Sequence, residues 1–288
     1  MPPRIPSPVG AHVAVGSGLV SGSLAYAEDI GAEAVQLFVS NPRGWAPTAG
    51  DPVKDAAFRA ACERRRTPVF VHATYLVNLG SPTDTTRTKS VQSLRGALRR
   101  GRRIGARGVV FHAGSAVDSG DRDEALRRIR DLLLPLLDEL TEEDPDLLVE
   151  LSAGGGGSLA ATVEELEPFL AVVDGHPRLG VCLDTCHAFA AGHDLATPGG
   201  VRSTLNTVRK TIGRGRLKLV HANDSLDPCG SRRDRHASIG AGRIGLDPFA
   251  ELFRHPITRG IPVIIETPGK APDHAKDVAA LKALRTGM

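Results

Sequence analysis

The chain has 288 residues, of which 41% are hydrophobic, 24% charged and 4% aromatic, so it can bury a large core made mainly of aliphatic side chains. Its formal net charge of +3 permits a nucleic-acid partner but does not require one. The four cysteines lack CxxC spacing, and we see neither a signal peptide nor a membrane span, so we expect a reducing, cytoplasmic setting without a disulfide framework.

Eight short apolar runs predict strands along the chain. They cover residues 10–15, 34–40, 68–73, 108–114, 147–154, 179–185, 217–224 and 262–269. Most are continuously apolar rather than alternating, which is typical of parallel strands that are covered on both faces. Between them lie segments of helix length with apolar residues three and four apart, such as residues 90–106 and 121–140.

A third predicted helix covers residues 162–175. Glu165 follows Thr162 by three residues, which is a capping-box pattern, and the segment ends at Gly175. Because strands and helices alternate throughout, we predict an α/β fold and, from the number of strands, a single (β/α)8 TIM barrel. A doubly wound parallel sheet is the alternative. We expect residues 1–7 to be a loose tail and residues 8–288 to form one domain.

Ionisable residues gather where the predicted strands end. Six strands end near His72, His112, Glu150, Asp184, His221 and Glu266. His187 follows Asp184 by three residues, and a loop motif, DRH, adds Asp234 and His236. The carboxyl ends of barrel strands meet at one face, so these nine residues are expected to share a pocket. His12 also follows a strand, but we interpret it as a satisfied neighbour rather than a ligand.

The expected pocket has the composition of a metal centre. Carboxylates confined together repel each other unless cations compensate them. Mixed imidazole and carboxylate ligands suit zinc or manganese, and nine ligands suit two or three ions. Neighbouring metal ions are typical of phosphate-ester hydrolysis, in which they activate water and neutralise the phosphodiester. The chain contains neither a GxSxG elbow nor a GxxxxGK[ST] phosphate loop.

Several stretches together resemble the endonuclease IV family of zinc-dependent apurinic/apyrimidinic endonucleases, also called the deoxyribonuclease IV type. They are GAHV, HATYLVNLGSP, FHAGS, CLDTCHAFAAGHD, HANDS, DRHASIGAGRIG and ETP, and they extend from about residue 10 to residue 269. The resemblance implies a (β/α)8 barrel with three Zn²⁺ ions, Mn²⁺ being an alternative in one site. It assigns catalytic roles to Glu150, Glu266 and Asp184.

The resemblance also implies a distribution of the ligands. The first ion would be held by His72, His112 and Glu150. Glu150 would bridge to a second ion, which would be held also by Asp184, His221 and Glu266. The third ion would be held by His187, Asp234 and His236.

The implied reaction is hydrolysis of the phosphodiester 5′ to an abasic site during DNA repair. It leaves a 3′-hydroxyl and a 5′-deoxyribose phosphate, and related enzymes also trim blocked 3′ ends. The partner would be double-stranded DNA, and we expect a monomer. Arg43, Tyr75 and Leu76 match positions that the family inserts into DNA. An aromatic and an apolar wedge can unstack a base step, and an abasic nucleotide is extruded at lower cost than an intact one.

The chain departs from the family pattern at five positions. Thr74 and Ala113 stand where the family has proline, Leu151 stands where it has asparagine, and Ala237 and Ser238 stand where it often has glutamate and histidine. None of these departures removes a predicted ligand. We expect them to change the hydrogen bonds around the ligands, and hence metal affinity or loop shape.

Two other classes of function remain as alternatives. A metal-dependent sugar isomerase or epimerase on a related barrel would need one or two ions and a pocket for a small polyol. The third ligand set and the residues that match the DNA wedge favour the nuclease over this enzyme. A DNA-binding protein that lost its chemistry would lack at least one ligand, and none is missing.

Overall fold

A closed barrel of eight parallel strands forms the centre of the computed structural model, which describes residues 6–46, 48–117 and 121–287. The strands follow one another around the barrel in the order β1-β10-β7-β6-β5-β4-β3-β2. They are β1 (Val9–His12), β2 (Val35–Phe38), β3 (Val69–His72), β4 (Gly108–His112), β5 (Asp146–Glu150), β6 (Leu179–Asp184), β7 (Leu217–His221) and β10 (Val263–Ile265). All eight predicted strands, and the TIM barrel, are thereby confirmed.

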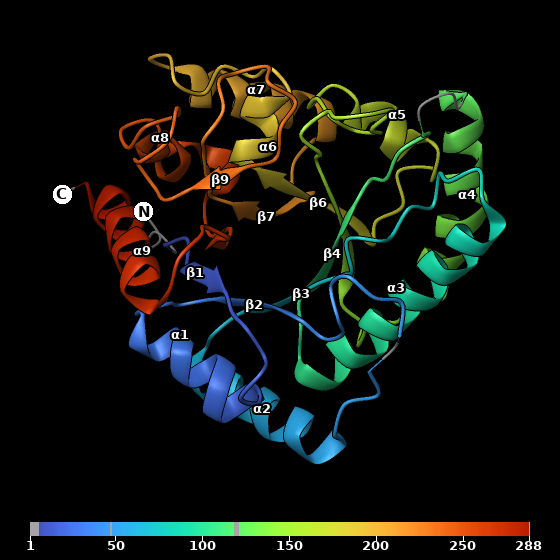
Figure 1. The fold of residues 1–288 in the computed structure, drawn as a ribbon, viewed down its shortest axis with the longest axis horizontal. Coiled ribbons are helices and arrows are strands. Elements are labelled where there is room, and N and C mark those ends of the chain that lie inside the picture. Colours follow the sequence, from blue (N-terminus) through green and yellow to red (C-terminus); the bar gives the residue numbers. More distant parts are fainter. Residues whose placement is uncertain (1–5, 47, 118–120, 288) are drawn as a thin grey trace.

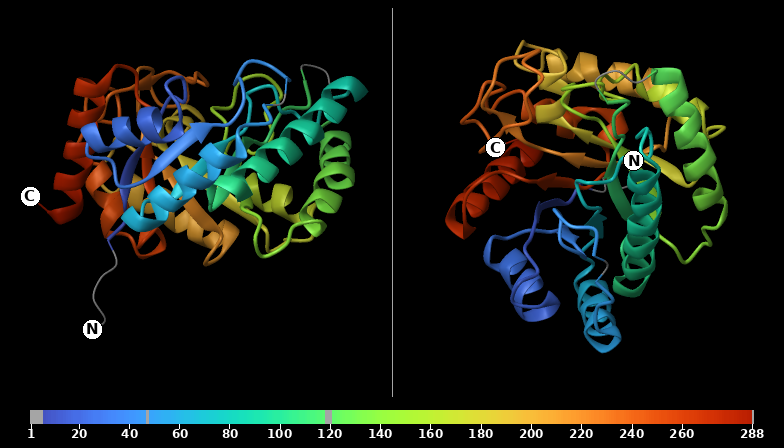
Figure 2. Two further views of the ribbon diagram at one scale, coloured as in Figure 1. Left: turned by 90° about the horizontal axis from the view of Figure 1, so that it is seen from below. Right: turned by 45° about the vertical axis from the view of Figure 1, so that its right-hand side comes forward.

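Helices surround the barrel on its outside (Figure 1). They are η1 (a π-helix, Leu19–Leu24), α1 (Ala25–Asp29), α2 (Pro52–Arg65), α3 (Asp84–Ile104), α4 (Arg122–Asp138), α5 (Leu166–Ala171), α6 (Thr185–Ala190), α7 (Gly200–Ile212), α8 (Phe249–Arg254), η2 (a 3-10 helix, Pro256–Thr258) and α9 (Ala271–Thr286). The right-hand view of Figure 2 shows the same ring of helices from another side. The barrel closes where β1 pairs with both β10 and β2.

The continuous apolar runs of the strands are explained by two separate cores. Alternate strand residues point into the barrel, where a small cluster packs that consists of Ala34, Phe70, Val110, Leu148, Cys182, Leu219 and Ile264. The other strand residues face the helices and join the larger outer core. Both faces of each strand are therefore covered, as parallel strands require. Gly10 shows how tight the barrel is, because a Cβ there would lie 2.0 Å from the carbonyl oxygen of Ala34.

The predicted helices exist, but their bounds differ from those expected. Helix α4 begins after Asp121, whose carboxylate accepts hydrogen bonds from Asp123 N and Glu124 N, as an N-cap does. Between residues 162 and 175 the regular helix is limited to α5, with turns on either side. The Glu165 carboxylate does reach back to Thr162 N, at 3.3 Å, so the capping contact forms ahead of the regular helix.

The bottom of the barrel includes part of the predicted tail. Residues 1–5 of that tail lie outside the described residues. Ser7, however, is buried: its hydroxyl donates a hydrogen bond of 2.8 Å to Thr258 O, and its carbonyl accepts one of 2.9 Å from Arg285 on α9. The prediction of a loose tail is therefore wrong at Ser7, because this residue is held between β1 and the last helix.

A small second sheet lies at the other end of the barrel. After β7 the chain forms β8 (Asp224–Ser225), and after a loop it returns as β9 (His236–Ala237), which pairs with β8 in antiparallel fashion. This hairpin carries the DRH motif. Among the described residues, none of the helices combines the length and the apolar character that crossing a bilayer requires.

Candidate metal centre

The nine predicted ligands converge at the carboxyl ends of the barrel strands. Strand register sets several of them side by side, since His112 pairs with Glu150, and Asp184 pairs with His221. Six of them line a cavity of about 390 Å³, and the other three, Glu150, Asp184 and His221, are fully buried. The lining of the cavity consists of His12, Phe38, His72, Tyr75, His112, His187, Asp234, His236, Glu266 and Thr267. Residues that are up to 255 positions apart in the sequence, from His12 to Thr267, thus share one pocket.

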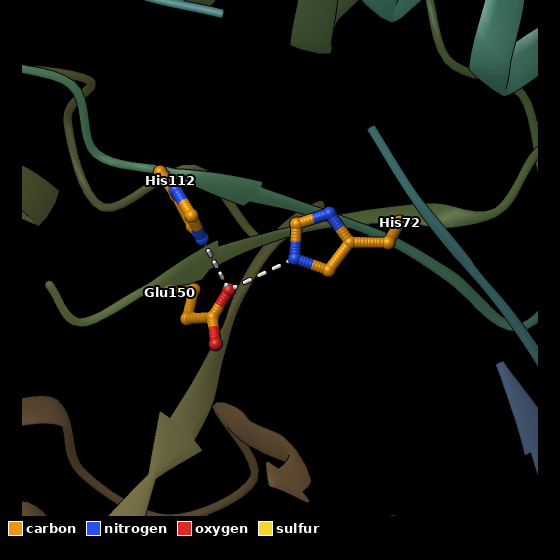
Figure 3. A group of neighbouring side chains, drawn as sticks. All are labelled: His72, His112 and Glu150. Carbon is orange, nitrogen blue, oxygen red and sulfur yellow. Dashed lines mark hydrogen bonds and ion pairs between the residues drawn. The ribbon is translucent and has the colours of Figure 1, made fainter. Parts of the chain in front are cut away.

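In the first group, two imidazoles point at one carboxylate oxygen (Figure 3). His72 Nε2 lies 3.1 Å from Glu150 Oε2, and His112 Nε2 lies 3.2 Å from the same atom. The Nδ1 atom of His72 is 2.7 Å from the carbonyl oxygen of Ala73, to which it can donate. That hydrogen bond leaves the Nε2 lone pair of His72 directed into the pocket.

The second group forms around the other oxygen of Glu150. His221 Nδ1 lies 2.7 Å from Glu150 Oε1, 3.3 Å from Glu266 Oε2 and 3.9 Å from Asp184 Oδ2. Asn223 holds two of these residues, because its amide donates to Asp184 Oδ2 at 2.7 Å and accepts from Glu266 N at 2.8 Å. The side chains of Glu150, Asp184 and His221 are fully buried, whereas that of Glu266 is partly exposed.

Sequence reasoning missed two amides that orient this group, Asn223 and Gln36. Gln36 donates to Glu266 Oε1 at 2.7 Å and accepts from His221 Nε2 at 2.9 Å. The second contact fixes the imidazole tautomer and leaves Nδ1 free to face the carboxylates. A glutamine within the apolar run of β2 is the signal that could have identified it. His12 Nδ1 lies 3.1 Å from Glu266 Oε1, and burial lowers the pKa of His12 although Glu266 opposes this effect.

The third group combines α6 with the hairpin. His187 Nε2 and His236 Nε2 each lie 3.1 Å from Asp234 Oδ1, and His236 Nε2 is 3.8 Å from Asp184 Oδ2. The Nδ1 atoms of both imidazoles are occupied, by Leu151 O at 2.8 Å and by Glu266 O at 3.1 Å. Both Nε2 atoms are buried, and within the described residues neither has a partner with acceptable hydrogen-bond geometry.

Electrostatics explain how so many ionisable groups coexist. Burial opposes charge on His187 and His221, but the surrounding carboxylates, together with Cys182 beside His221, outweigh it and raise the pKa of both well above the ordinary value. For the same reasons the pKa of His236 rises to about 9. Burial would raise the pKa of Glu150 and of Asp234, but the neighbouring imidazoles lower both. The carboxylates therefore require positive charge, and a divalent cation would provide it by displacing protons from the imidazoles.

These residues fit divalent metal ions. Within each of three groups, one ligand atom per residue lies within 4.8 Å of the others. The groups are His72–His112–Glu150, Glu150–Asp184–His221–Glu266 and His187–Asp234–His236. The unpartnered Nε2 atoms of the third group are the strongest indication, since two buried imidazole nitrogens face a carboxylate without hydrogen bonds. Cys182 and Cys186 lie close by, but burial raises the pKa of each thiol to about 12.

The residues predicted to contact DNA lie on two neighbouring loops, and one of them, Tyr75, lines the cavity. Arg43 and Tyr75 are exposed, and Leu76 is half-buried. The Pro42 carbonyl accepts hydrogen bonds from Tyr75 N at 3.0 Å and from Thr74 Oγ1 at 2.6 Å, which links the two loops. Thr74 therefore makes a contact that a proline at its position could not make.

The other departures from the family pattern also lie next to the ligands. Leu151 is fully buried, and its main-chain carbonyl, not its side chain, receives the hydrogen bond from His187. Ala237 is buried and pairs with Asp224. Ala113, which directly follows His112 in the sequence, is also buried. The contact of Leu151 with a ligand is thus made by its main chain and does not depend on its side chain.

Comparison with known proteins identifies relatives over nearly the whole chain. A family model described as "Xylose isomerase-like TIM barrel" matches residues 24–286. "Probable endonuclease 4" of Streptomyces avermitilis is 57% identical over 98% of this chain and 91% of its own length. Its counterpart in Streptomyces coelicolor is 56% identical over 98% and 96%. The crystal structure of endonuclease IV from Thermus thermophilus superimposes with a TM-score of 0.84 at 34% identity, covering 99% of this chain and 100% of that one.

Proposed function

The chain belongs to the endonuclease IV family and is a metal-dependent apurinic/apyrimidinic endonuclease of DNA repair, and from this premise we propose the reaction that it performs. It hydrolyses the phosphodiester 5′ to an abasic site and leaves a 3′-hydroxyl and a 5′-deoxyribose phosphate. It also trims blocked 3′ ends. The single observation that best supports this proposal is the convergence of three groups of imidazole and carboxylate ligands at the carboxyl ends of the barrel strands.

We propose that three Zn²⁺ ions occupy these groups, with Mn²⁺ as the alternative in one of them. The three sets of ligands are those that the resemblance assigned: His72, His112 and Glu150; Glu150, Asp184, His221 and Glu266; and His187, Asp234 and His236. Bound ions of this kind lower the pKa of water and stabilise negative charge on a phosphodiester and its leaving oxygen.

The proposed catalytic carboxylates are Glu150, Asp184 and Glu266, and their own contacts support different tasks. Glu150 presents one oxygen to His72 and His112 and the other to His221, so it is suited to join two ligand groups. Glu266 is held in position by Gln36, and Asp184 by Asn223, as described above. Carboxylates held in this way need little reorganisation when charge develops on the substrate.

The proposed DNA contacts use the two linked loops. Tyr75 and Leu76 would wedge into a base step, and Arg43 would meet phosphate. Burial, followed by nearby carboxylates, raises the pKa of Tyr75 to about 12, so its phenol stays neutral and can donate a hydrogen bond. Specificity would arise because an abasic nucleotide is extruded at low cost, without base readout. We propose that the protein acts as a monomer on double-stranded DNA. The cytoplasmic location stays a prediction.

Cleavage of a duplex that carries one tetrahydrofuran abasic analogue tests the proposal. The analogue cannot undergo β-elimination, so a cut must be hydrolytic. We expect a 3′-hydroxyl product from the zinc-loaded wild type, and almost none from Glu266→Gln or from metal-stripped protein. Glu33→Gln, which alters a glutamate at the barrel bottom, is the matched control and should cut normally. A folded, fully metallated wild type that makes no cut would overturn the proposal and favour a sugar isomerase or epimerase.

A further inference from the structure

The carboxylate of Asp224 is completely buried and is surrounded by main-chain N–H groups. Four donors come from the loop that follows β9: Gly240 at 3.1 Å, Gly242 at 3.0 Å, Ile244 at 2.8 Å and Gly245 at 3.2 Å. Among the described residues, no Lys, Arg or His side chain forms an ion pair with Asp224. Ser225 N also donates, at 2.7 Å, so all the hydrogen bonds that satisfy this buried carboxylate come from the main chain, and most of them come from the loop.

The same aspartate determines the position of the hairpin that carries two predicted ligands. In the β8–β9 pairing, Asp224 lies opposite Ala237, and Ser225 lies opposite His236. The loop after β9 then returns to this point, where Arg243 N donates to Ser225 O at 2.7 Å. The strand that contains His236 therefore pairs with β8, and the loop that follows this strand returns to bind β8 through Asp224 and Ser225.

The glycine-rich composition of the loop reflects this close approach. At Gly242, a Cβ atom would lie 2.4 Å from Asp224 Oδ1 and 2.4 Å from Ser225 O. Any side chain there would push the loop away from the carboxylate. The sequence SIGAGRIG, whose function the site itself does not explain, is thus matched to one buried aspartate.

We infer that Asp224 is a positioning residue for the third metal ion: by binding the loop it holds Asp234 and His236 toward His187. This inference rests on the proposed three-ion centre. It does not extend to the other two ligand groups, whose residues lie on barrel strands or directly at their ends. Loss of Asp224 should therefore weaken one site selectively, and the remaining sites should keep their ions.

The test compares wild type with Asp224→Asn, in which an amide replaces one acceptor oxygen with a donor. We expect zinc binding at the third site to weaken about 10- to 100-fold, as for residues that orient metal ligands, while two ions stay bound. Hydrogen exchange of the Gly240, Gly242 and Ile244 amides in the zinc-loaded protein should accelerate. Cleavage activity should return as zinc is raised, because all three ligands of the site remain.

Asp247→Asn is the matched control, because Asp247 is exposed and lies just after the same loop. It should leave zinc content and exchange near wild type. Gly242→Ala should weaken the third zinc site in the same way, because its Cβ displaces the loop without changing the aspartate. Its control is Gly16→Ala, since a Cβ at Gly16 meets nothing within 4 Å.

Three ions bound with wild-type affinity and unchanged exchange in both Asp224→Asn and Gly242→Ala would overturn the inference. An equal loss in Asp247→Asn would overturn it as well. If Asp224→Asn does not fold, zinc binding and hydrogen exchange of Gly242→Ala test the inference instead. A wild type that binds fewer than three ions would instead contradict the proposed centre, and the exchange of the loop amides would still show whether Asp224 holds the loop.

Discussion

Two regions of the centre hold the same kinds of side chain by different means. Among the strand-held ligands, His221 and Glu150 are fully buried and are positioned by the parallel ladder of the barrel. The loop-held ligands, Asp234 and His236, belong to a two-stranded hairpin, and the Asp234 side chain is 51% exposed. A barrel ladder is stabilised by the whole core, whereas the hairpin depends on the contacts of Asp224. We therefore expect the two regions to respond differently to perturbation.

The largest effect is expected in the strand-held region. Glu150→Gln should lower kcat/KM on the tetrahydrofuran duplex by more than about 1000-fold, because a metal centre supplies several kcal/mol of charge stabilisation and each 1.4 kcal/mol corresponds to about tenfold in rate. Zinc content measured on the same samples should fall by more than one ion. A loss below tenfold would mean that Glu150 does not join two sites.

A smaller effect is expected from Gln36→Leu, which removes the hydrogen bonds to Glu266 and His221 but keeps every ligand. Metal affinity or activity should fall about 10- to 100-fold, as is usual for groups that orient metal ligands. Gln92→Leu on α3 is the control and should be neutral. If Gln36→Leu releases the loop-held ion as well, the two regions are not independent.

The rate of zinc release compares the regions directly. After addition of a chelator to the wild type, we expect one ion to leave about tenfold faster than the others. Groups that orient metal ligands change metal affinity by about 10- to 100-fold, so a difference of this size is expected between the two regions. Asp224→Asn should accelerate only this fast phase. Release of all ions in a single phase would contradict the distinction between strand-held and loop-held ligands.

A modest effect is expected for DNA binding. Arg43→Ala should reduce the slope of log affinity against log salt concentration by about 1, because one phosphate contact is lost. Zinc content should not change. Binding to the abasic duplex can be followed by fluorescence anisotropy over a range of salt, and an unchanged slope would exclude a phosphate contact by Arg43.

The smallest effect concerns the barrel bottom. Burial would raise the pKa of Glu33, but Arg285 and the Val9 N–H outweigh it and lower that pKa. The contribution of Glu33 to stability is thus present above its ordinary pKa of 4.5 and is lost as pH falls through the lower folded value. Glu33→Gln should destabilise the protein by less than about 1 kcal/mol at neutral pH, since the pair is partly exposed. Thermal melts of both proteins from pH 7 to pH 3 should converge, whereas zinc content at pH 7 should be equal.

The sequence predicted those features that depend on a local pattern of residues, namely the strands and the ionisable residues at their ends. Apolar runs identify strands because both faces of each are buried, and His72, His112 or Glu266 stand out because ionisable residues end such runs. Tertiary hydrogen bonds were harder to predict. Gln36 contacts His221 across 185 positions, and only the closed barrel brings the two together. Ser7 was taken for tail because its partners, Thr258 and Arg285, lie at the far end of the chain.

The metal groups were predicted from residue types and from a family resemblance, but their dependence on the Asp224 loop was not. A single aspartate beside a glycine-rich stretch has no local pattern that indicates four converging N–H groups. Helix bounds failed for a related reason, since α5 shows regular geometry over only part of the segment that the capping pattern predicts.

The link at Pro42 has a consequence for protein engineering. One carbonyl oxygen accepts hydrogen bonds from both Thr74 and Tyr75, so the loops after β2 and β3 form a single mechanical unit. Exchange of the loop after β3 alone for that of a relative with proline in place of Thr74 would remove the hydroxyl from the junction, whereas exchange of the loop after β2 alone would replace the residue that supplies the accepting carbonyl, Pro42. Grafts intended to alter damage preference should therefore transfer residues 40–46 and 73–77 together.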